Sequence, residues 1–575
     1  MSSNITLPSP TQRVSAKLWW IAAALLCVAG WNCTVPAADH SSQLLMAAIV
    51  FFGAITAWTS YTNGDDKTAR ALPFMLVLTV FWSLLIWGFR SADINGERYF
   101  FLADDMMISM RAARNFADGL GLVWNPGEYL EVFTNLLWTL LMAGTHLLSL
   151  PDRLASVPIM AVSVIGGVIC LPLAQRWAKA LGANAATQAL VMMAMMVNAV
   201  LTTNVVVAFE QTLIVTIFMA SLLYLLEDIH SGAVRPWGFI CLGLIPLFRM
   251  DAAILSVATG LWVIYEHPKR LKVISYLALA VVPSIVATLA RHAYYGDWLP
   301  NTYYLKMSGW PDRWKTGVHY TIGFLRGYGW AFVLIALAWL RGGIRLNPAW
   351  RAVIIISGAQ LAYGAYIGGD VLGVHRVFAA VVVLLLAAGF TASQTLFNNK
   401  LVTATIAIVA AALLARSSYI MPGLSEVRRQ DTNNIALALK LNQEAPTALV
   451  ADGYAGNLFY FAYRVRGIDV LGKTDAHVSH MAVPHKGTTP GHNKFDFDYS
   501  IGTLHPDYVV ALYEGASPDE ETLRKVDGNW NFPRYQWFNT AFREHCLPHP
   551  MPWNTWRTVF RCDWSNPTVA PANPS

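Results

Sequence analysis

Two adjacent carboxylates, Asp104 and Asp105, follow closely after an apolar run, Leu72–Phe89, that is long enough to cross a membrane. A carboxylate at a membrane–water boundary is unfavourable unless it is paired, coordinates an ion or takes part in chemistry. Capping of the following helix is the alternative, because Asp is a favoured N-cap residue. Capping accounts for Asp104 only, so both interpretations of the pair stay open.

The composition places these residues in a polytopic membrane protein. Of the 575 residues, 55% are hydrophobic and 13% are charged, whereas soluble domains carry about 25% charged residues. The net charge of +6 does not indicate a nucleic-acid partner, since the Lys and Arg residues fall mostly in short loops, where they set orientation. The six Cys residues lack metal-ligand spacing, and the sequence has no glycine-rich phosphate loop, so zinc and nucleotide binding have no support.

The apolar runs predict about thirteen transmembrane helices, with the N-terminus in the cytoplasm and the C-terminus outside. A crossing at Asn135–Leu150 would place Arg176 and Lys179 outside, so we predict a helix on the outer surface there. Trp237–Phe248 and Ala252–Tyr265 are each short for a span and could form a broken pair. The predicted spans are Leu18–Trp31, Leu44–Tyr61, Leu72–Phe89, Ala155–Leu173, Ala185–Leu201, Thr212–Leu226, Trp237–Phe248, Ala252–Tyr265, Val273–Leu289, Ile322–Leu340, Val353–Ile367, Val377–Leu396 and Leu401–Leu414.

The chain becomes polar after the last predicted span. Short strands are predicted at Thr447–Val450, Arg466–Val470 and Asp507–Leu512, which indicates a small α/β domain outside the membrane. Cys546 and Cys562 could form a disulfide in that compartment or remain two buried thiols. The predicted division is 1–71 for additional transmembrane helices, 72–420 for a transmembrane catalytic module with its first outer loop at 90–154, and 421–575 for the soluble domain.

The stretch Leu102–Trp138 resembles the first periplasmic loop of membrane glycosyltransferases with the GT-C fold. The resemblance is closest to the arabinofuranosyltransferases of the AftB and TfpW type, whose pattern is roughly DDAYIxxRxARNLAxGxGLVFNPGExVExxTNxLW. The matching residues are Asp104-Asp105, Ile108, Arg111, Ala113-Arg114-Asn115, Gly119, Gly121-Leu122-Val123, Asn125-Pro126-Gly127-Glu128, Glu131, Thr134-Asn135 and Trp138. A match of this length is specific, whereas an acidic pair by itself would indicate no family.

Two later segments with acidic and basic residues resemble further motifs of this family. Ala208–Thr212, which contains Glu210, resembles GxET; the alternative is an ordinary acid at the start of a helix. Arg249-Met250-Asp251 resembles TRPE, with the Pro-Glu replaced. Arg249 could bind a lipid phosphate bidentately, or it could form a structural pair with Asp251 or Glu210.

Gly296–Lys306 resembles the GxxLPNTxYxK motif of the family, with Asn301 and Tyr304 at matching positions. Lys306 could neutralise a phosphate or extend its ammonium group to the membrane interface. Gly368–Arg376 resembles GGDxMPxxRF, with Leu372-Gly373 in place of Met-Pro, and it carries Asp370, His375 and Arg376. Three segments of the soluble domain also resemble family motifs, namely Asp452–Gly456, Asp469–Asp475 and Pro490–Lys494.

The resemblance implies a GT-C glycosyltransferase of the cytoplasmic membrane that transfers D-arabinofuranose from a polyprenyl-phosphate donor at the outer face. The acceptor would be a cell-envelope glycan or a surface protein such as pilin. Asp104, ahead of Asp105, would be the base that takes the acceptor proton, and the acidic pair could also hold a divalent cation. The phosphate would be bound by Arg249, Lys306, His375 and Arg376. The other substrate contacts would come from Glu210, Asp251, Asn301, Tyr304 and Asp370.

Two alternatives stand beside this interpretation. A transferase of another lipid-phosphate sugar, such as mannose, would need the same residue types. A membrane transporter would also place charges at membrane depth and use broken helices. The transporter is disfavoured because the charged residues gather on one predicted face and a soluble domain follows on the same side.

Overall fold

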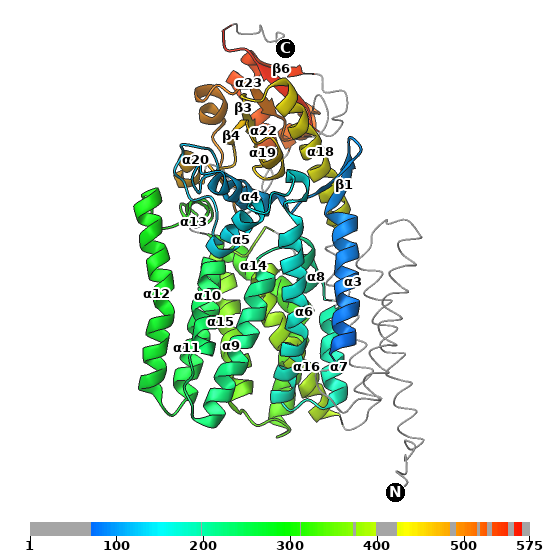
Figure 1. Cartoon of the computed structure of the whole chain (residues 1–575), viewed down its shortest axis with the longest axis vertical. Coiled ribbons are helices and arrows are strands. Elements are labelled where there is room, and N and C mark those ends of the chain that lie inside the picture. The colour runs from blue at the N-terminus through cyan, green and yellow to red at the C-terminus, as the bar shows by residue number, and fades with distance from the viewer. Residues whose placement is uncertain are drawn as a thin grey trace.

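The computed structural model describes residues 71–565 apart from 197, 311, 372–374, 398–421, 484–489, 514–517, 526–531 and 550–556. The predicted spans Leu18–Trp31, Leu44–Tyr61 and Leu401–Leu414 lie outside the described residues. A bundle of long helices forms the larger part of the molecule, and the C-terminal residues pack on one end of it (Figure 1).

The bundle helices follow the predicted apolar runs. They are α3 (Leu72–Phe89), α6 (Val157–Ala180), α7 (Ala185–Met196), α8 (Ala199–Val206), α9 (Gln211–Ser231), α10 (Trp237–Phe248), α11 (Ala253–Glu266), α12 (Arg270–Tyr295), α14 (Arg313–Leu340), α15 (Pro348–Ile367) and α16 (Ala379–Leu396). Within the described residues, five helices are long and apolar enough to cross a membrane: α6, α9, α12, α14 and α16, the first and last with their leading 3-10 turns. The bent pair α7 and α8 would make a sixth.

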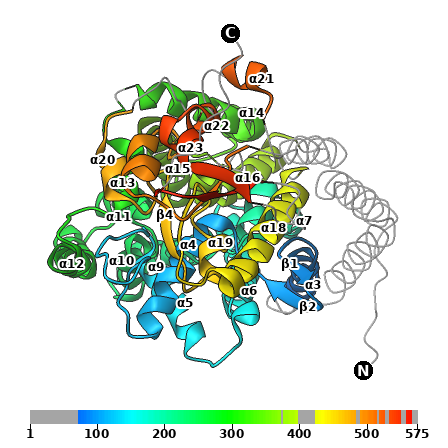
Figure 2. The same cartoon turned by 90° about the horizontal axis from the view of Figure 1, so that it is seen from above.

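Burial differs strongly between two of these helices. Nearly every side chain of α16 is buried, so this helix forms the centre of the bundle. In contrast, α12 buries only Val273 and Arg291 and lies at one edge of the bundle (Figure 2). An apolar helix exposed in this way is stable only in a surrounding of lipid.

The predicted broken pair is confirmed. Helix α10 ends at Phe248, and Arg249 is extended, with φ −164° and ψ 121°. A single 3-10 turn, η2 (Met250–Ala252), then leads into α11. The side chain of the extended Arg249 reaches Asp251 in this turn. The break therefore places two ionisable groups between the end of α10 and the start of α11.

Short elements cover the end of the bundle at which this break lies. A hairpin of β1 (Ser91–Ile94) and β2 (Glu97–Phe100) leads into α4 (Asp104–Ala117), and α5 (Leu136–His146) and α13 (Asn301–Met307) lie close by (Figure 1). Helix α5 has 11 residues and is therefore about 16 Å long, too short to cross a membrane. This length agrees with the expected non-crossing helix, and its place on the outer surface stays a prediction.

The C-terminal residues form a five-stranded sheet of order β4-β3-β5-β7-β6. Strand β3 pairs in parallel with β4 and β5, and β7 pairs antiparallel with β5 and β6. We call residues 422–565 the C-terminal domain. Its elements are α18 (Pro422–Glu444), β3 (Leu449–Asp452), α19 (Asn457–Phe461), β4 (Arg466–Asp469), α20 (Ala476–His480), η4 (Asp498–Thr503), β5 (Tyr508–Val510), α21 (Glu520–Lys525), α22 (Phe532–Trp537), α23 (Thr540–His545), β6 (Cys546–His549) and β7 (Val559–Cys562).

Cys546 and Cys562 are joined by a disulfide, which resolves the alternative left open by the sequence. The two residues are direct partners in the β6–β7 ladder. The two cysteines are 16 positions apart in the sequence. Removing the bond with Cys546→Ser/Cys562→Ser is expected to destabilise the C-terminal domain by about 3 kcal/mol, because the bond restricts a loop of about this length in the unfolded chain.

Hydrogen–deuterium exchange of the β5–β7 amides would measure this loss. Cys241→Ser is the matched control, since Cys241 is a free cysteine of the helical bundle. Unchanged exchange in the double variant would show that the bond contributes no stability.

The C-terminal domain packs closely on the first loop of the chain. Arg111 of α4 donates to the carbonyl of Val465 at 2.8 Å, and Arg90 pairs with Asp431 at 3.0 Å, with both side chains buried. Glycines allow the close approach: a Cβ on Gly456 would lie 1.9 Å from the Asp104 carbonyl oxygen. The contact fixes the domain against the helix that carries the acidic pair.

Candidate active site

A cavity of about 320 Å³ lies where the bundle end meets the C-terminal domain. Its walls come from α4, α13, the break between α10 and α11, the loop before α16, and two loops of the C-terminal domain. Eight acidic or basic side chains line it: Asp105, Arg249, Asp251, Lys306, Asp370, Arg376, Lys473 and His492. Six of the eight were identified as site residues from the sequence.

Asp105 faces this cavity from the first turn of α4, and its side chain is 36% exposed. Its Oδ2 lies 3.8 Å from Nη2 of Arg376. Burial alone would raise the pKa of Asp105, but the nearby charges of Arg376, Lys306 and Lys473 hold it below its usual value. Asp105 is therefore an ionised carboxylate that a substrate can reach.

Asp104 has different surroundings, because successive residues of a helix point about 100° apart. Its Oδ1 accepts the Asn457 N–H at 2.8 Å, and its Oδ2 accepts the Gly456 N–H at 3.3 Å. Burial raises the pKa of Asp104 to about 6, although the Asn457 hydrogen bond opposes the shift. The residue expected first as the base thus binds the C-terminal domain and does not line the cavity, whereas Asp105 does.

Arg249 is held by two carboxylates. Its Nη1 donates to Glu210 Oε1 at 2.8 Å, and its Nε and Nη2 contact the two Asp251 oxygens at 2.5 and 2.9 Å. Glu210 is fully buried and also accepts from Asn135 Nδ2 at 3.2 Å. Both structural pairs considered from the sequence are formed, so the charge of Arg249 is already compensated within the protein.

Arg376 is held in a similar way by Asp370. Their Nε–Oδ2 and Nη2–Oδ1 distances are 2.6 and 2.9 Å, and both side chains are less than 5% exposed. The guanidinium also lies 4.6 Å from the ring centre of Phe209. The two-point contact orients Arg376, whose Nη2 then lies between Asp370 and Asp105 at the cavity.

Two lysines of the cavity lining, Lys306 and Lys473, carry positive charges that no carboxylate of the described residues pairs with. Within the described part of the chain, neither Lys306 nor Lys473 forms an ion pair; Lys473 Nζ donates to the Gly453 carbonyl at 3.0 Å. Gly491 packs on Lys306, since a Cβ there would lie 3.2 Å from Cε. Burial lowers the pKa of Lys306, opposed by Asp370 and Asp105.

Lys473 and His492 belong to segments that resembled family motifs but were given no role from the sequence. Their position in these motif-like segments was the signal available in the sequence. Only the packing of the C-terminal domain on the bundle places them at the cavity. Burial and the nearby Lys473 lower the pKa of His492 to about 3, so its ring is neutral near pH 7. Tyr303 and Tyr363 are further lining residues that sequence reasoning missed.

Five expected site residues lie outside the cavity lining: Asp104 and Glu210, described above, and His375, Asn301 and Tyr304. His375 packs against the rings of Tyr320 and Phe324, with centroids 4.7 and 5.8 Å away, and burial lowers its pKa to about 4. A neutral ring cannot supply the phosphate-binding charge expected of it. The order of motif residues did not reveal this, because the aromatic cage comes from another helix.

Asn301 and Tyr304 support the C-terminal domain. Asn301 Nδ2 donates to the carbonyls of Gly472 and Lys473, both at 2.9 Å. Tyr304 stacks on His480 with ring centroids 4.1 Å apart. These contacts hold the C-terminal domain in place beside the cavity. Asn301 and Tyr304 therefore help to position Lys473 and do not line the cavity themselves.

The described residues do not fit a divalent cation at the acidic pair. Asp104 and Asp105 have different surroundings, and the other two lining carboxylates are paired with arginines. Among the described residues there is no group of three His, Cys, Asp or Glu side chains that could hold a metal ion. We therefore assign no step of the reaction to a metal.

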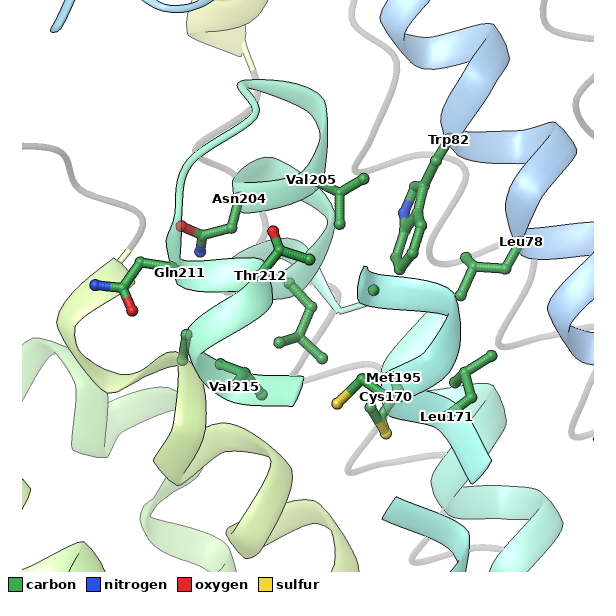
Figure 3. Close-up of a pocket in the computed structure, with 13 residues that line it drawn as sticks. Leu78, Trp82, Cys170, Leu171, Met195, Asn204, Val205, Gln211, Thr212 and Val215 are labelled. Carbon is green, nitrogen blue, oxygen red and sulfur yellow. The ribbon is translucent and has the colours of Figure 1, made fainter. Parts of the chain in front are cut away.

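A second recess, inside the bundle, is unsuited to chemistry. It has a volume of about 20 Å³, roughly one water molecule. Figure 3 shows its lining, in which Leu78, Trp82, Leu171 and Met195 surround the space and Asn204 lies at one side. No Asp, Glu, His, Lys or Arg side chain of the described residues lines the recess, and the thiol of Cys170 in its lining is buried.

No known family model matches the chain, and no curated protein matches its sequence. Among solved structures, the crystal structure of ArnT from Cupriavidus metallidurans bound to undecaprenyl phosphate is similar, with a TM-score of 0.51 and 12% sequence identity. The similarity covers 87% of this chain and 99% of that chain. At this identity the likeness is one of fold: the chain is a multi-pass membrane protein with the GT-C fold, while the narrower AftB/TfpW-type resemblance stays a prediction.

Proposed function

We propose that this protein transfers a sugar from a polyprenyl-phosphate donor to an acceptor hydroxyl. The observation that carries the proposal is a single cavity in which the ionised Asp105 lies among Lys306, Lys473 and Arg376. A carboxylate can take the acceptor proton, and cations can stabilise a departing phosphate. The fold shared with ArnT, whose structure contains undecaprenyl phosphate, supports the class of donor.

The reaction would be a direct displacement at the anomeric carbon. The acceptor oxygen forms the new bond to this carbon as its proton passes to Asp105. The bond between the anomeric carbon and the phosphate oxygen breaks, and the electron pair leaves with the lipid phosphate. Within the described residues, neither Lys306 nor Lys473 has a carboxylate partner at ion-pair distance, but Lys473 already donates to the Gly453 carbonyl. Lys306 would therefore stabilise that charge.

The two sides of the cavity suit a lipid and a polar acceptor. Apolar residues of the bundle side, including Val132, Phe133 and Ile367, would lie against the first prenyl units. The loops of the C-terminal domain cover the opposite side, where Lys473 and His492 would meet the sugar and the acceptor. This domain would face the outside of the cytoplasmic membrane, as the Lys and Arg distribution predicts.

The sugar and the acceptor rest on the sequence resemblance alone. D-arabinofuranose is proposed as the transferred unit, and the acceptor as a cell-envelope glycan or a pilin-like surface protein. Among the described aromatic side chains of the C-terminal domain, Phe459 and Tyr460 are fully buried and so cannot stack on a sugar. Tyr454 is occupied by Arg557, which lies 4.6 Å from its ring centre.

The test uses the purified full-length protein in detergent, with polyprenyl-phosphoryl arabinofuranose or mannose and an envelope extract as acceptor. We expect release of polyprenyl phosphate from the arabinose donor without any ion gradient, and a loss of about a hundredfold in Lys306→Met. Lys315→Met is the matched control, since Lys315 is exposed and pairs only with Asp312. Turnover of the mannose donor alone would refute arabinose, and turnover of neither donor would refute the transferase.

A further inference from the structure

A further and larger recess, of about 510 Å³, lies on the opposite side of the segment 131–136 from the cavity that holds Asp105. Glu131 and Leu136 line this recess, whereas the four residues between them, 132–135, line that cavity. The two spaces therefore share one wall that is a single chain thick. Most of the remaining lining is apolar and comes from Phe116, Leu122 and the α12 residues Ala287 and Ala290.

One cation in this recess has an unused donor. Arg291 of α12 is 6% exposed, and its Nε is paired with Glu131 Oε2. Its Nη1 is buried and has no hydrogen-bond partner among the described residues. Leaving such a donor unsatisfied costs about 1–3 kcal/mol, and more for a charged group, so the recess favours a ligand that brings an acceptor oxygen to Arg291.

Two other polar groups of the recess bond to the backbone of Leu122. Tyr295 donates its hydroxyl hydrogen to the Leu122 carbonyl at 2.7 Å, and the Tyr294 hydroxyl accepts the Leu122 N–H at 3.2 Å. Burial raises the pKa of Glu131 to about 6, against the effect of Arg291, so the carboxylate opposing an anion is easily neutralised. Arg291 Nη1 is thus the charged donor that remains for a ligand, and the Tyr294 hydroxyl hydrogen is a second, neutral donor.

The surface next to the recess suits a long hydrocarbon chain. On α12, Leu279, Val282, Val286 and Leu289 form one exposed stripe, each between 46% and 66% exposed. This stripe follows helical spacing and adjoins the face that lines the recess. Helix α12 lies at the edge of the bundle (Figure 2), so a lipid can reach the stripe directly from the membrane.

We propose that this recess is a second binding site for polyprenyl phosphate, with the phosphate on Arg291 and the chain along α12. The identity of the lipid rests on the proposed function, because the site would hold the donor or the spent carrier one wall away from the cavity. The charge and the unused donor suit any lipid that carries a phosphate, whereas the wall shared with the cavity favours the carrier over a bulk phospholipid.

The test counts the lipids bound to the full-length protein by native mass spectrometry with undecaprenyl phosphate. Wild type is expected to bind two molecules. Arg291→Met/Glu131→Gln removes both charges together, so no buried carboxylate is left unpaired; we expect one molecule, with the affinity of the recess lowered at least about tenfold. Glu131→Gln alone is expected to bind two molecules, with tighter binding at the recess.

Three results would overturn the proposal: a single bound lipid in wild type, two lipids with unchanged affinity in the double variant, or displacement of the second lipid by phosphatidylglycerol as readily as by undecaprenyl phosphate. Lys306→Met separates this site from the proposed function. That variant should weaken only the lipid in the cavity, and if it weakens neither lipid, the cavity assignment fails while the recess is still judged by the double variant.

Discussion

Asp105→Asn is expected to lower sugar transfer by a factor of about 10²–10⁴, the range for loss of a general base. Asn keeps the size of the side chain but cannot accept the acceptor proton. Asp105 contributes little to stability through its partner, because the contact with Arg376 is long, at 3.8 Å, and Arg376 keeps Asp370. Steady-state turnover of the purified variant, together with its thermal unfolding temperature, would measure both effects.

Asp104→Asn is the matched control in the same helix turn. It should reduce the two backbone hydrogen bonds from Gly456 and Asn457, and so loosen the C-terminal domain more than it slows the chemistry. A loss of turnover that is larger in Asp104→Asn than in Asp105→Asn, with both proteins folded, would reverse the assignment of the base.

The pH dependence of kcat/KM gives an independent check of this pair. A base acts in its ionised form, so activity falls as pH drops through its pKa. Burial raises the pKa of Asp105, but the positive charges of Arg376 and Lys306 outweigh this effect and hold the pKa below its usual value. We therefore expect no fall of kcat/KM from protonation of Asp105 above pH ~5. A fall near pH 6 would match Asp104, whose buried carboxyl has a pKa of about 6.

The loop that carries the acidic pair and most bundle helices could be located from the sequence, because both signals are local. The apolar runs at Trp237–Phe248 and Val377–Leu396 are long enough to identify their helices without any tertiary contact. The acidic pair and the break at Arg249 were identified in the same way, from residue types within a few positions of one another. The 23-residue helix α18 was missed, because its polar composition hides the few side chains, such as Ile435 and Leu441, that pack inward.

The roles of individual site residues could not be predicted in the same manner, since they depend on contacts between distant segments. The choice between Asp104 and Asp105 depends on Gly456 and Asn457, which are about 350 residues away in the chain. His375 fails as a cation because Tyr320 and Phe324 of α14 enclose it. A motif records which residues occur together, but not which of two neighbours faces a cavity.

Arg249 is the position at which a single substitution should most strongly affect stability. Arg249→Met would leave Glu210, which is fully buried, and Asp251 without their cation. Breaking a buried ion pair by removing one partner destabilises a protein by about 3–5 kcal/mol, because an uncompensated charge remains. The variant is therefore expected to insert poorly and to unfold early, measured as the free energy of unfolding in mixed micelles with SDS.

The rescue experiment distinguishes this structural role from a direct contact with the donor phosphate. Arg249→Met/Glu210→Gln/Asp251→Asn removes all three charges and should recover most of the lost stability, because neutral side chains are cheaper to bury than unpaired charges. If Arg249 mainly holds the break between α10 and α11, this triple variant should also regain part of its binding of undecaprenyl phosphate. A stable triple variant with no lipid binding would instead assign the guanidinium to the phosphate, and wild-type stability of Arg249→Met would contradict the buried ion pair.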